Sequence, residues 1–225
     1  MSTAQRPGPG GLDLADDKAQ ALALTPVSRE TEKRLDIFVE LLLRWQQTTN
    51  LISPSTIPQL WTRHIADSLQ LIELAPGAKT WVDFGSGGGF PAIPVACALA
   101  NQPGAMVHLV ESNGKKAAFL REVIRATGVP GQVHAQRIEK FVSSTVNTVD
   151  VVSARALAPL KTLCDQAFPL IERRAIGLFL KGLDVESELT EASKYWTLKA
   201  TKVPSKTSPD GCVVIVRNLK PQATT

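Results

Sequence analysis

The residues best suited to chemistry in this 225-residue chain form a glycine-rich stretch that follows a short apolar run. Asp83 ends the run, and Gly85, Gly87, Gly89 and then Phe90 follow it. This order predicts a strand, a tight loop and a helix, which is where α/β folds bind nucleotide-like cofactors. Glycines leave no side chain to keep a ligand away from the backbone. A dinucleotide fingerprint would need a glycine at the position of Phe90, which disfavours an NAD-dependent oxidoreductase.

A second set of candidate cofactor-binding residues follows the next two predicted strands. Glu111 ends an apolar run about 20 residues beyond the glycines, where a carboxylate can accept both ribose hydroxyls of a nucleoside. The alternative is a surface acid that caps the following helix. Ile138 and Glu139 come after the third predicted strand, where an adenine ring would lie. The main chain there would read the adenine edge while Ile138 packs on its face.

Two cations lie at the carboxyl ends of predicted strands. Arg155 ends the fourth strand and Lys181 follows the fifth, and open α/β folds bind their ligands at this rim. Two cations there suit an anionic substrate. The alternative is that Arg155 pairs with Asp83 or Glu111 and only braces the site.

Four further candidates for substrate binding lie upstream, on a predicted helix: Arg63, His64, Asp67 and Ser68. Positions 64, 67 and 68 share one face of that helix. The alternative is that His64 and Asp67 form a hydrogen-bonded pair and nothing else. No set of histidines or carboxylates has the spacing of metal ligands, so we expect no metal.

The elements that must position these residues change character along the chain. Residues 12–77 are expected to form a helical extension. One amphipathic helix starts after Thr25–Ser28 and ends near residues 48–50, and a second covers Gln59–Leu74. Residues 1–11 and 221–225 are expected to be tails, with the first one disordered, on a chain that forms one compact unit overall.

Residues 78–220 alternate strand-like and helix-like segments, which predicts an α/β domain with a mostly parallel sheet and helices on both faces. The last two strand-like runs are separated by a gap too short for a crossover helix, so they predict an antiparallel hairpin. The expected strands are Thr80–Phe84, Met106–Val110, Val133–Ala135, Val149–Ser153, Gly177–Leu180, Trp196–Val203 and Cys212–Arg217.

Composition and charge set the class of protein and of partner. The net charge is +4, and residues 194–225 carry six basic residues against the single acid Asp210. This basic segment could bind a phosphate-rich partner. The alternative is a lysine-rich surface that contacts only solvent. Three cysteines, odd in number and far apart, predict buried thiols in a reducing compartment. Neither an apolar run long enough to span a membrane nor a signal peptide is visible. We expect a cytoplasmic protein, not bound to a membrane, that acts as a monomer.

Taken together, the motifs resemble the RsmG (GidB) family of small-subunit ribosomal RNA methyltransferases. The likeness runs from about residue 28 to residue 217. The glycine loop alone is typical of the whole superfamily that uses S-adenosyl-L-methionine. The Arg63-His64-x-x-Asp67-Ser68 motif, Phe90-Pro91-x-Ile93-Pro94 and Ser153-x-Arg155-Ala156 together are family-specific. The motifs are Arg44-Trp45-Gln46 with Asn50-Leu51, Arg63-His64-x-x-Asp67-Ser68, Asp83-x-Gly85-Ser86-Gly87-x-Gly89-Phe90-Pro91-x-Ile93-Pro94, Glu111-Ser112-x-x-Lys115-Lys116-x-x-Phe119-Leu120, Ser153-x-Arg155-Ala156 and Leu180-Lys181-Gly182.

The resemblance implies a class I (Rossmann-like) methyltransferase that uses S-adenosyl-L-methionine to methylate N7 of one guanosine in 16S ribosomal RNA, as naked RNA or in the small subunit. We expect Arg155 to orient the guanine, and Lys181 is a further catalytic candidate. Two departures stand out, because Glu111 replaces a frequent aspartate and Pro209-Asp210-Gly211 replaces basic residues before the last strand. The resemblance implies cofactor contacts from Gly85, Phe90, the Ile138–Glu139 segment and Arg155. The full set of expected cofactor-binding residues is Asp83, Gly85, Gly87, Gly89, Phe90, Glu111, Ser112, Ile138, Glu139 and Arg155.

Guanine N7 has an in-plane lone pair and no proton to lose, so this transfer needs alignment and exclusion of water rather than a general base. Two other functions stay open at the level of sequence. One is a methyltransferase that acts on a different RNA, a protein or a small molecule. The other is a non-catalytic RNA-binding assembly factor on the same fold, which the intact glycine loop disfavours.

Overall fold

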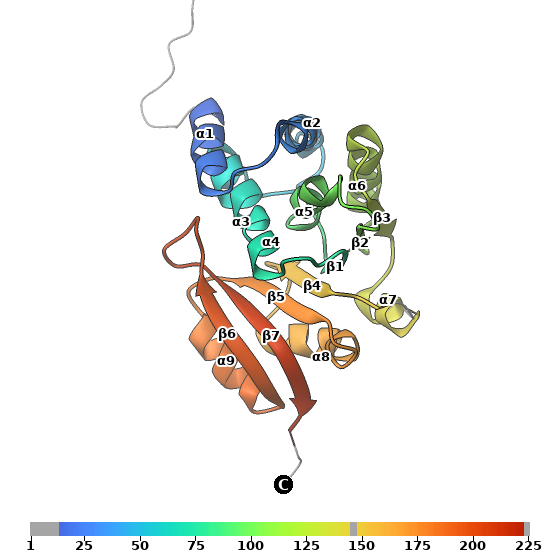
Figure 1. Cartoon of the computed structure of the whole chain (residues 1–225), viewed down its shortest axis with the longest axis vertical. Helices are drawn as coiled ribbons and strands as arrows, with labels where there is room; N and C mark the ends of the chain where they lie inside the picture. Colours follow the sequence, from blue (N-terminus) through green and yellow to red (C-terminus); the bar gives the residue numbers. More distant parts are fainter. Residues whose placement is uncertain (1–13, 145–147, 223–225) are drawn as a thin grey trace, which may run out of the picture.

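The computed structural model describes residues 14–144 and 148–222, and its centre is a seven-stranded sheet (Figure 1). The strands lie in the order β3-β2-β1-β4-β5-β7-β6, in which β1 to β5 are parallel and β7 and β6 form an antiparallel hairpin at one edge. The strand order reverses between β1 and β4, which places a ligand crevice at their carboxyl ends. The strands are β1 Thr80–Phe84, β2 Met106–Val110, β3 Gly131–His134, β4 Val151–Arg155, β5 Ile176–Lys181, β6 Trp196–Pro204 and β7 Cys212–Pro221.

This architecture confirms the predicted fold class, including the closing hairpin. The bounds of β1 and β2 agree with the sequence prediction. Strand β4 runs two residues further than expected, so that Arg155 is itself the last residue of the strand. The predicted tail 1–11 and most of the tail 221–225 lie outside the described residues.

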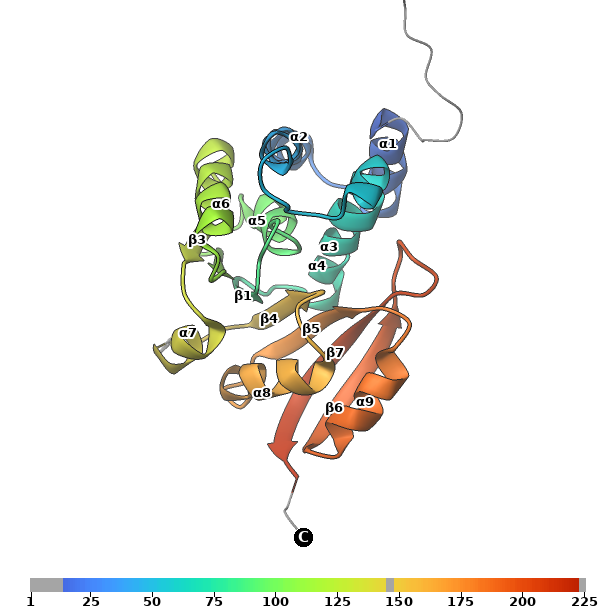
Figure 2. The ribbon, with the colours of Figure 1, turned by 180° about the vertical axis from the view of Figure 1, so that it is seen from behind.

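Helices cover both faces of the sheet (Figures 1 and 2). One face carries α1 Leu14–Leu24, α2 Arg29–Gln46, α5 Ala92–Leu99 and α6 Gly114–Thr127. The other face carries α7 Ile138–Ser144, α8 Leu160–Ile171 and α9 Val185–Ser193. Side chains along β1 alternate between the two faces of the sheet. Trp81 is buried in the core under α2, α5 and α6, whereas Val82 is buried in the core under α7, α8 and α9.

Helix α2 begins where the sequence predicts it. The Ser28 hydroxyl accepts a hydrogen bond from the Thr31 amide and caps the helix. Leu35, Phe38 and Leu42 recur at three- and four-residue spacing and are fully buried. Helix α2 shares one apolar core with the sheet, across the boundary expected at residue 77.

The segment expected as a single helix over Gln59–Leu74 is divided into three short elements. They are η2 Trp61–Ala66, a π-helix, α3 Asp67–Leu69 and α4 Leu71–Leu74. The 3₁₀ helix η1 Pro54–Gln59 precedes them and contains Pro58, which lacks the amide needed to continue an α-helix. The buried Asp17 carboxylate of α1 accepts hydrogen bonds from the Trp61 amide at 2.7 Å and the Thr62 amide at 3.2 Å, which fixes the start of the π-helix.

The cysteines are free thiols, of which Cys97 and Cys164 are buried and Cys212 is half-buried. Burial raises the pKa of the Cys97 and Cys164 thiols to about 12, so neither is a nucleophile at neutral pH. Within residues 14–144 and 148–222, no helix is long and apolar enough to cross a membrane.

Candidate active site

The glycine loop follows β1 in a backbone conformation that favours glycine. Gly85, Gly87 and Gly89 have φ angles of +63°, +50° and +91°. A β-carbon on Gly85 would lie 2.5 Å from Cδ1 of Leu157, a residue of the loop after β4. Any side chain at position 85 would therefore meet both backbone strain and the neighbouring loop.

Asp83 is buried at the end of β1, beneath the glycine loop. Its Oδ1 accepts a hydrogen bond from the Ser153 hydroxyl at 2.7 Å, whereas its Oδ2 is buried without a partner among the described residues. Burial raises the pKa of the Asp83 carboxyl to about 7, against the hydrogen bonds and the Arg155 charge, which lower it. A buried carboxylate oxygen without a donor fits a site whose ligand supplies the missing hydrogen bond.

Glu111 ties the end of β2 to the glycine loop. Its Oε2 accepts from the Gly87 amide at 2.9 Å and its Oε1 from the Asn113 amide at 2.7 Å. Asn113, not Glu111, caps helix α6 through its bonds to the Lys115 and Lys116 amides, so the helix-cap alternative for Glu111 is wrong. Each carboxylate oxygen keeps a lone pair for a ribose hydroxyl. Ser112 lies beside it and is exposed.

The Ile138–Glu139 segment begins α7 close to the end of β3. The Ile138 side chain is half-buried and packs against the core under α8. Glu139 is exposed and accepts a hydrogen bond from the Gln166 amide of α8 at 2.9 Å. The Glu139 side chain is thus held on the protein surface. The backbone of the Ile138–Glu139 segment is therefore the part that could contact a ligand.

A cavity of about 910 Å³ opens beside the glycine loop. It lies between η1 and η2, the ends of β4 and β5, and the loop that joins β6 to β7. It brings together five of the predicted residues from three separate parts of the sequence: Arg63, His64 and Asp67, Arg155, and Lys181. Leu157 lines the cavity and also contacts the glycine loop, so the two sites adjoin. Ser68 is outside the cavity lining, because it is fully buried and donates to the His64 carbonyl at 2.6 Å.

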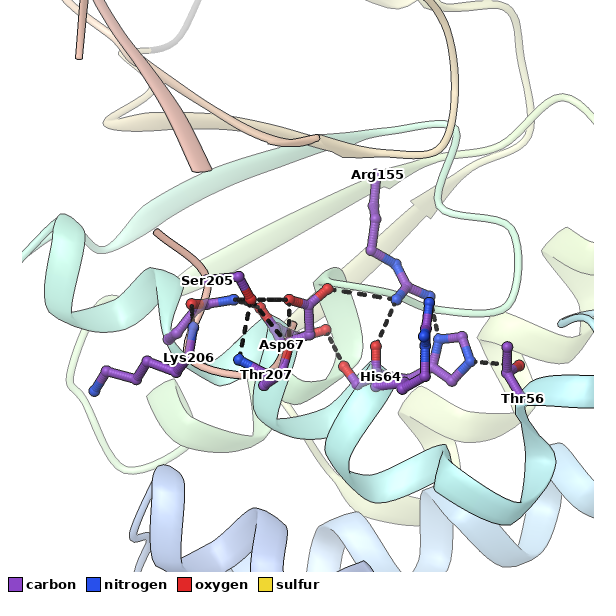
Figure 3. Close-up of polar contacts among 10 residues, drawn as sticks. Thr56, His64, Asp67, Arg155, Ser205, Lys206 and Thr207 are labelled. Atoms are coloured by element: carbon purple, nitrogen blue, oxygen red, sulfur yellow. Dashed lines mark hydrogen bonds and ion pairs between the residues drawn. The ribbon is translucent and has the colours of Figure 1, made fainter. Parts of the chain in front are cut away.

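Arg155 crosses this cavity and is held by the segment that carries His64 (Figure 3). Its Nη1 donates to the Arg63 carbonyl at 3.0 Å and lies 3.7 Å from Asp67 Oδ2, and its Nη2 donates to His64 Nδ1. The guanidinium also stacks 5.1 Å from the ring centroid of Phe90. Arg155 therefore forms an ion pair, but its partner is Asp67 and not Asp83 or Glu111, the two acids expected from the sequence.

His64 is a neutral acceptor in this arrangement. Arginine only donates, so Nδ1 of His64 carries the lone pair and Nε2 carries the proton, which it donates to Thr56 Oγ1 at 2.8 Å. Burial, reinforced by the Arg155 and Arg63 charges, lowers the pKa of His64 to about 3. The alternative of a simple His64–Asp67 pair is wrong, because each side chain has other partners.

Asp67 fixes the loop between β6 and β7, a contact that no sequence pattern indicated. Its Oδ1 accepts from Gln70 Nε2 at 2.8 Å, Thr207 Oγ1 at 2.9 Å and Ser205 Oγ at 3.2 Å (Figure 3). The Lys206 ammonium in the same loop pairs with Glu73 at 2.6 Å. The hairpin loop is therefore a wall of the cavity that is anchored on α3 and α4.

Lys181 is engaged within the cavity wall rather than free. Its Nζ donates to the Ala158 carbonyl at 2.7 Å and pairs with Glu188 Oε2 at 2.6 Å. Glu188, on α9, was not among the predicted site residues. The signal that could have indicated it is an acid seven residues after the Lys181-Gly182 motif, which is too common to stand out.

Comparisons with known proteins show the family and the fold. The family model described as rRNA small subunit methyltransferase G matches residues 31–212. A protein of that name from Bradyrhizobium sp. (strain BTAi1) is 61% identical over 203 residues, which are 90% of this chain and 91% of the relative. Another from Rhodopseudomonas palustris (strain BisB18) is 57% identical over 222 residues, or 99% of this chain and 95% of the relative.

Solved structures share the fold at much lower sequence identity. An O-methyltransferase from Bacillus cereus in complex with SAH superposes with a TM-score of 0.58 at 13% identity, over 91% of this chain and 97% of that one. A putative O-methyltransferase from Klebsiella pneumoniae gives a TM-score of 0.57 over 91% of this chain and 96% of that one, again at 13% identity. The match of the family model over most of the chain, with relatives above 55% identity, shows that the chain belongs to the rRNA small subunit methyltransferase G family.

Proposed function

We propose that this protein transfers a methyl group from S-adenosyl-L-methionine to N7 of one guanosine in 16S ribosomal RNA. The observation that carries the proposal is the junction at Leu157, where the glycine loop meets a cavity crossed by Arg155. A methyl donor on the loop and a base in the cavity would be neighbours there. Membership of an rRNA methyltransferase family supplies the class of substrate.

The residues present fit the cofactor. Glu111 would take the ribose hydroxyls, the buried Oδ2 of Asp83 would accept a hydrogen bond from the ligand side, and the glycines would let the donor approach the backbone. The cofactor, when bound, supplies an electrophilic methyl group on a sulfonium sulfur. The proposed binding set is Asp83, Gly85, Gly87, Gly89, Phe90, Glu111, Ser112, Ile138, Glu139 and Arg155.

The cavity suits a reaction without a general base. His64 uses both ring nitrogens in hydrogen bonds and is neutral at physiological pH, so it holds Arg155 rather than moving a proton. Arg155 would donate to guanine O6, which lies beside N7 on the same base edge. The Phe90 ring stacks on the Arg155 guanidinium and helps to hold it in place. Catalysis would then depend on the alignment of N7 with the methyl carbon.

The supporting roles divide between binding and positioning. Arg63 is exposed at the cavity and would contact a phosphate, whereas His64 and Asp67 position Arg155, and Ser68 supports their helix from within. Lys181 holds the loop after β4 through Ala158. We also propose that the protein acts as a monomer and that it works in the cytoplasm, where its substrate is assembled.

The test is methyl transfer by the purified protein. Small-subunit RNA and intact small subunits from cells lacking the protein would be incubated with labelled S-adenosyl-L-methionine, and digested nucleosides would be identified by mass spectrometry. Label in N7-methylguanosine from one position supports the proposal. Label on an exocyclic amine, a ribose or a protein contradicts it. Failure to bind the cofactor by calorimetry would instead favour a non-catalytic assembly factor.

A further inference from the structure

We propose that Glu188 is a specificity-determining residue that accepts hydrogen bonds from N1–H and the 2-amino group of the acceptor guanine. This inference rests on the proposed function, because it concerns the base that the cavity would hold. It assigns a substrate contact to an acid that the sequence motifs did not single out.

The Glu188 carboxylate is fixed on one side and open on the other. Its Oε2 accepts from Lys181 Nζ at 2.6 Å and from the Leu160 amide at 2.6 Å. Within the described part of the chain, Oε1 has no hydrogen-bond partner. The side chain lines the cavity and keeps 23% of its surface exposed, while the Lys181 side chain keeps only 8%. A buried cation thus holds the acid in place, with one oxygen available.

The other acids that line the cavity do not share this arrangement. Asp67 receives three donors on Oδ1, and its Oδ2 faces the Arg155 guanidinium at 3.7 Å, so this acid is committed to the hairpin loop and to Arg155. Asp210 is exposed in the hairpin loop. Glu188 is therefore the lining carboxylate in the described chain that is both positioned and available to accept from a ligand.

Guanine matches a carboxylate on one edge and an arginine on the other. Its Watson–Crick edge presents the N1–H and 2-amino donors, and its other edge presents the N7 and O6 acceptors. Adenine would present the N1 lone pair to the acid, and a carboxylate can only accept. Glu188 and Arg155 would therefore select guanine from opposite sides of the cavity.

The same contact would assist the transfer. Methylation of N7 places a positive charge on the purine ring, and that charge develops in the transition state. A fixed carboxylate hydrogen-bonded to the ring stabilises it more than it stabilises the neutral base. Glu188 would thus raise the rate as well as the selectivity.

The experiment compares guanosine with inosine, which keeps N1–H and N7 but lacks the 2-amino group. Small-subunit RNA carrying either base at the modified position would be assayed for kcat/KM with the wild type, Glu188→Gln and a matched control, Glu191→Gln. Glu191 lies on the same helix, pairs with Lys194 and is not among the cavity-lining residues. Thermal unfolding checks that each variant folds, and Glu188→Asp serves if Glu188→Gln does not fold.

For the wild type and Glu191→Gln we expect a guanosine preference of about 10- to 100-fold, the effect of one hydrogen bond to a charged group. For Glu188→Gln we expect the preference to fall below about 3-fold. An equal loss on both substrates, with the preference unchanged, would overturn the proposal and leave Glu188 as a brace for the loop after β4. A wild-type protein that methylates neither RNA would contradict the proposed function itself, and the role of Glu188 in it.

Discussion

At the residue scale, the side chain of Arg155 makes contacts that no other cation could reproduce. Its planar fork reaches the Arg63 carbonyl and His64 Nδ1 together while it stacks on Phe90. Lysine supplies a point charge without this geometry. We expect Arg155→Lys and Arg155→Ala to lower kcat at least 100-fold, with Arg217→Lys on the exposed part of β7 as a control. Unchanged turnover and cofactor affinity in Arg155→Ala would show that Arg155 does not orient the base.

His64 and Asp83 make opposite contributions to stability between pH 4 and pH 6.5. The folded pKa of His64, about 3, is below its ordinary 6.5, so its contribution is lost as the pH falls. The folded pKa of Asp83, about 7, is above its ordinary 3.8, so its contribution is lost as the pH rises.

Substitution should separate the two titrations. Relative to the wild type, we expect His64→Gln to gain roughly 1 to 3 kcal/mol of unfolding free energy as the pH falls from 6.5 to 4, and Asp83→Asn to lose a similar amount. Urea unfolding at several pH values measures both slopes. Parallel curves for the variants and the wild type would mean that these groups titrate normally in the folded protein.

Gly85 can be tested against a glycine with the same backbone. Gly128 ends α6 at φ +65°, close to the +63° of Gly85, but a β-carbon there meets nothing within 4 Å. Both alanine variants should lose about 1 kcal/mol of stability. Only Gly85→Ala should weaken cofactor binding, about 10-fold or more, because its methyl group would push Leu157 into the cofactor site. Calorimetry measures this affinity. Equal cofactor affinities would separate Gly85 from the donor site.

At the scale of elements, the hairpin loop depends on Asp67 for its position. Ser205 and Thr207 bond to Asp67 Oδ1, and the Lys206 amide bonds to Gln70 Oε1 at 3.0 Å. We expect Asp67→Ala to speed amide hydrogen exchange over residues 205–211 about 10-fold or more, because the loop loses its anchor. Asp210→Ala, at an exposed position of the same loop, should leave exchange unchanged. Slow exchange in Asp67→Ala would show that the loop holds itself.

The elements also show which parts of the site a sequence can predict. The glycine loop, β1, β2 and the cap at Ser28 are local patterns, and the prediction placed them well. The Asp67–Thr207 bond joins residues 140 positions apart, and no local period encodes it. Likewise, the π-helix that carries His64 depends on the distant Asp17 carboxylate, so a regular helix was the natural expectation from residues 59–74 alone.

At the scale of the whole molecule, only half of the six basic residues in residues 194–225 are free of an acidic partner in the described chain. Lys194, Lys202 and Lys206 pair with acids, which leaves Lys199, Arg217 and Lys220 without an ion pair in the described chain. If RNA contacts these three cations, log Kd should change with log salt concentration with a slope of about 2 to 3. Filter binding from 50 to 300 mM salt measures it. Salt-independent binding would contradict an electrostatic contribution from this surface.

We propose that this chain, as a whole molecule, installs one N7-methylguanosine in small-subunit ribosomal RNA. The most direct measurement is quantitative mass spectrometry of that RNA from cells with the protein, cells without it, and cells that carry Arg155→Ala. We expect one N7-methylguanosine per RNA at a single position, lost in the second and third strains and restored by the intact gene. The same amount of N7-methylguanosine in all three strains would contradict it.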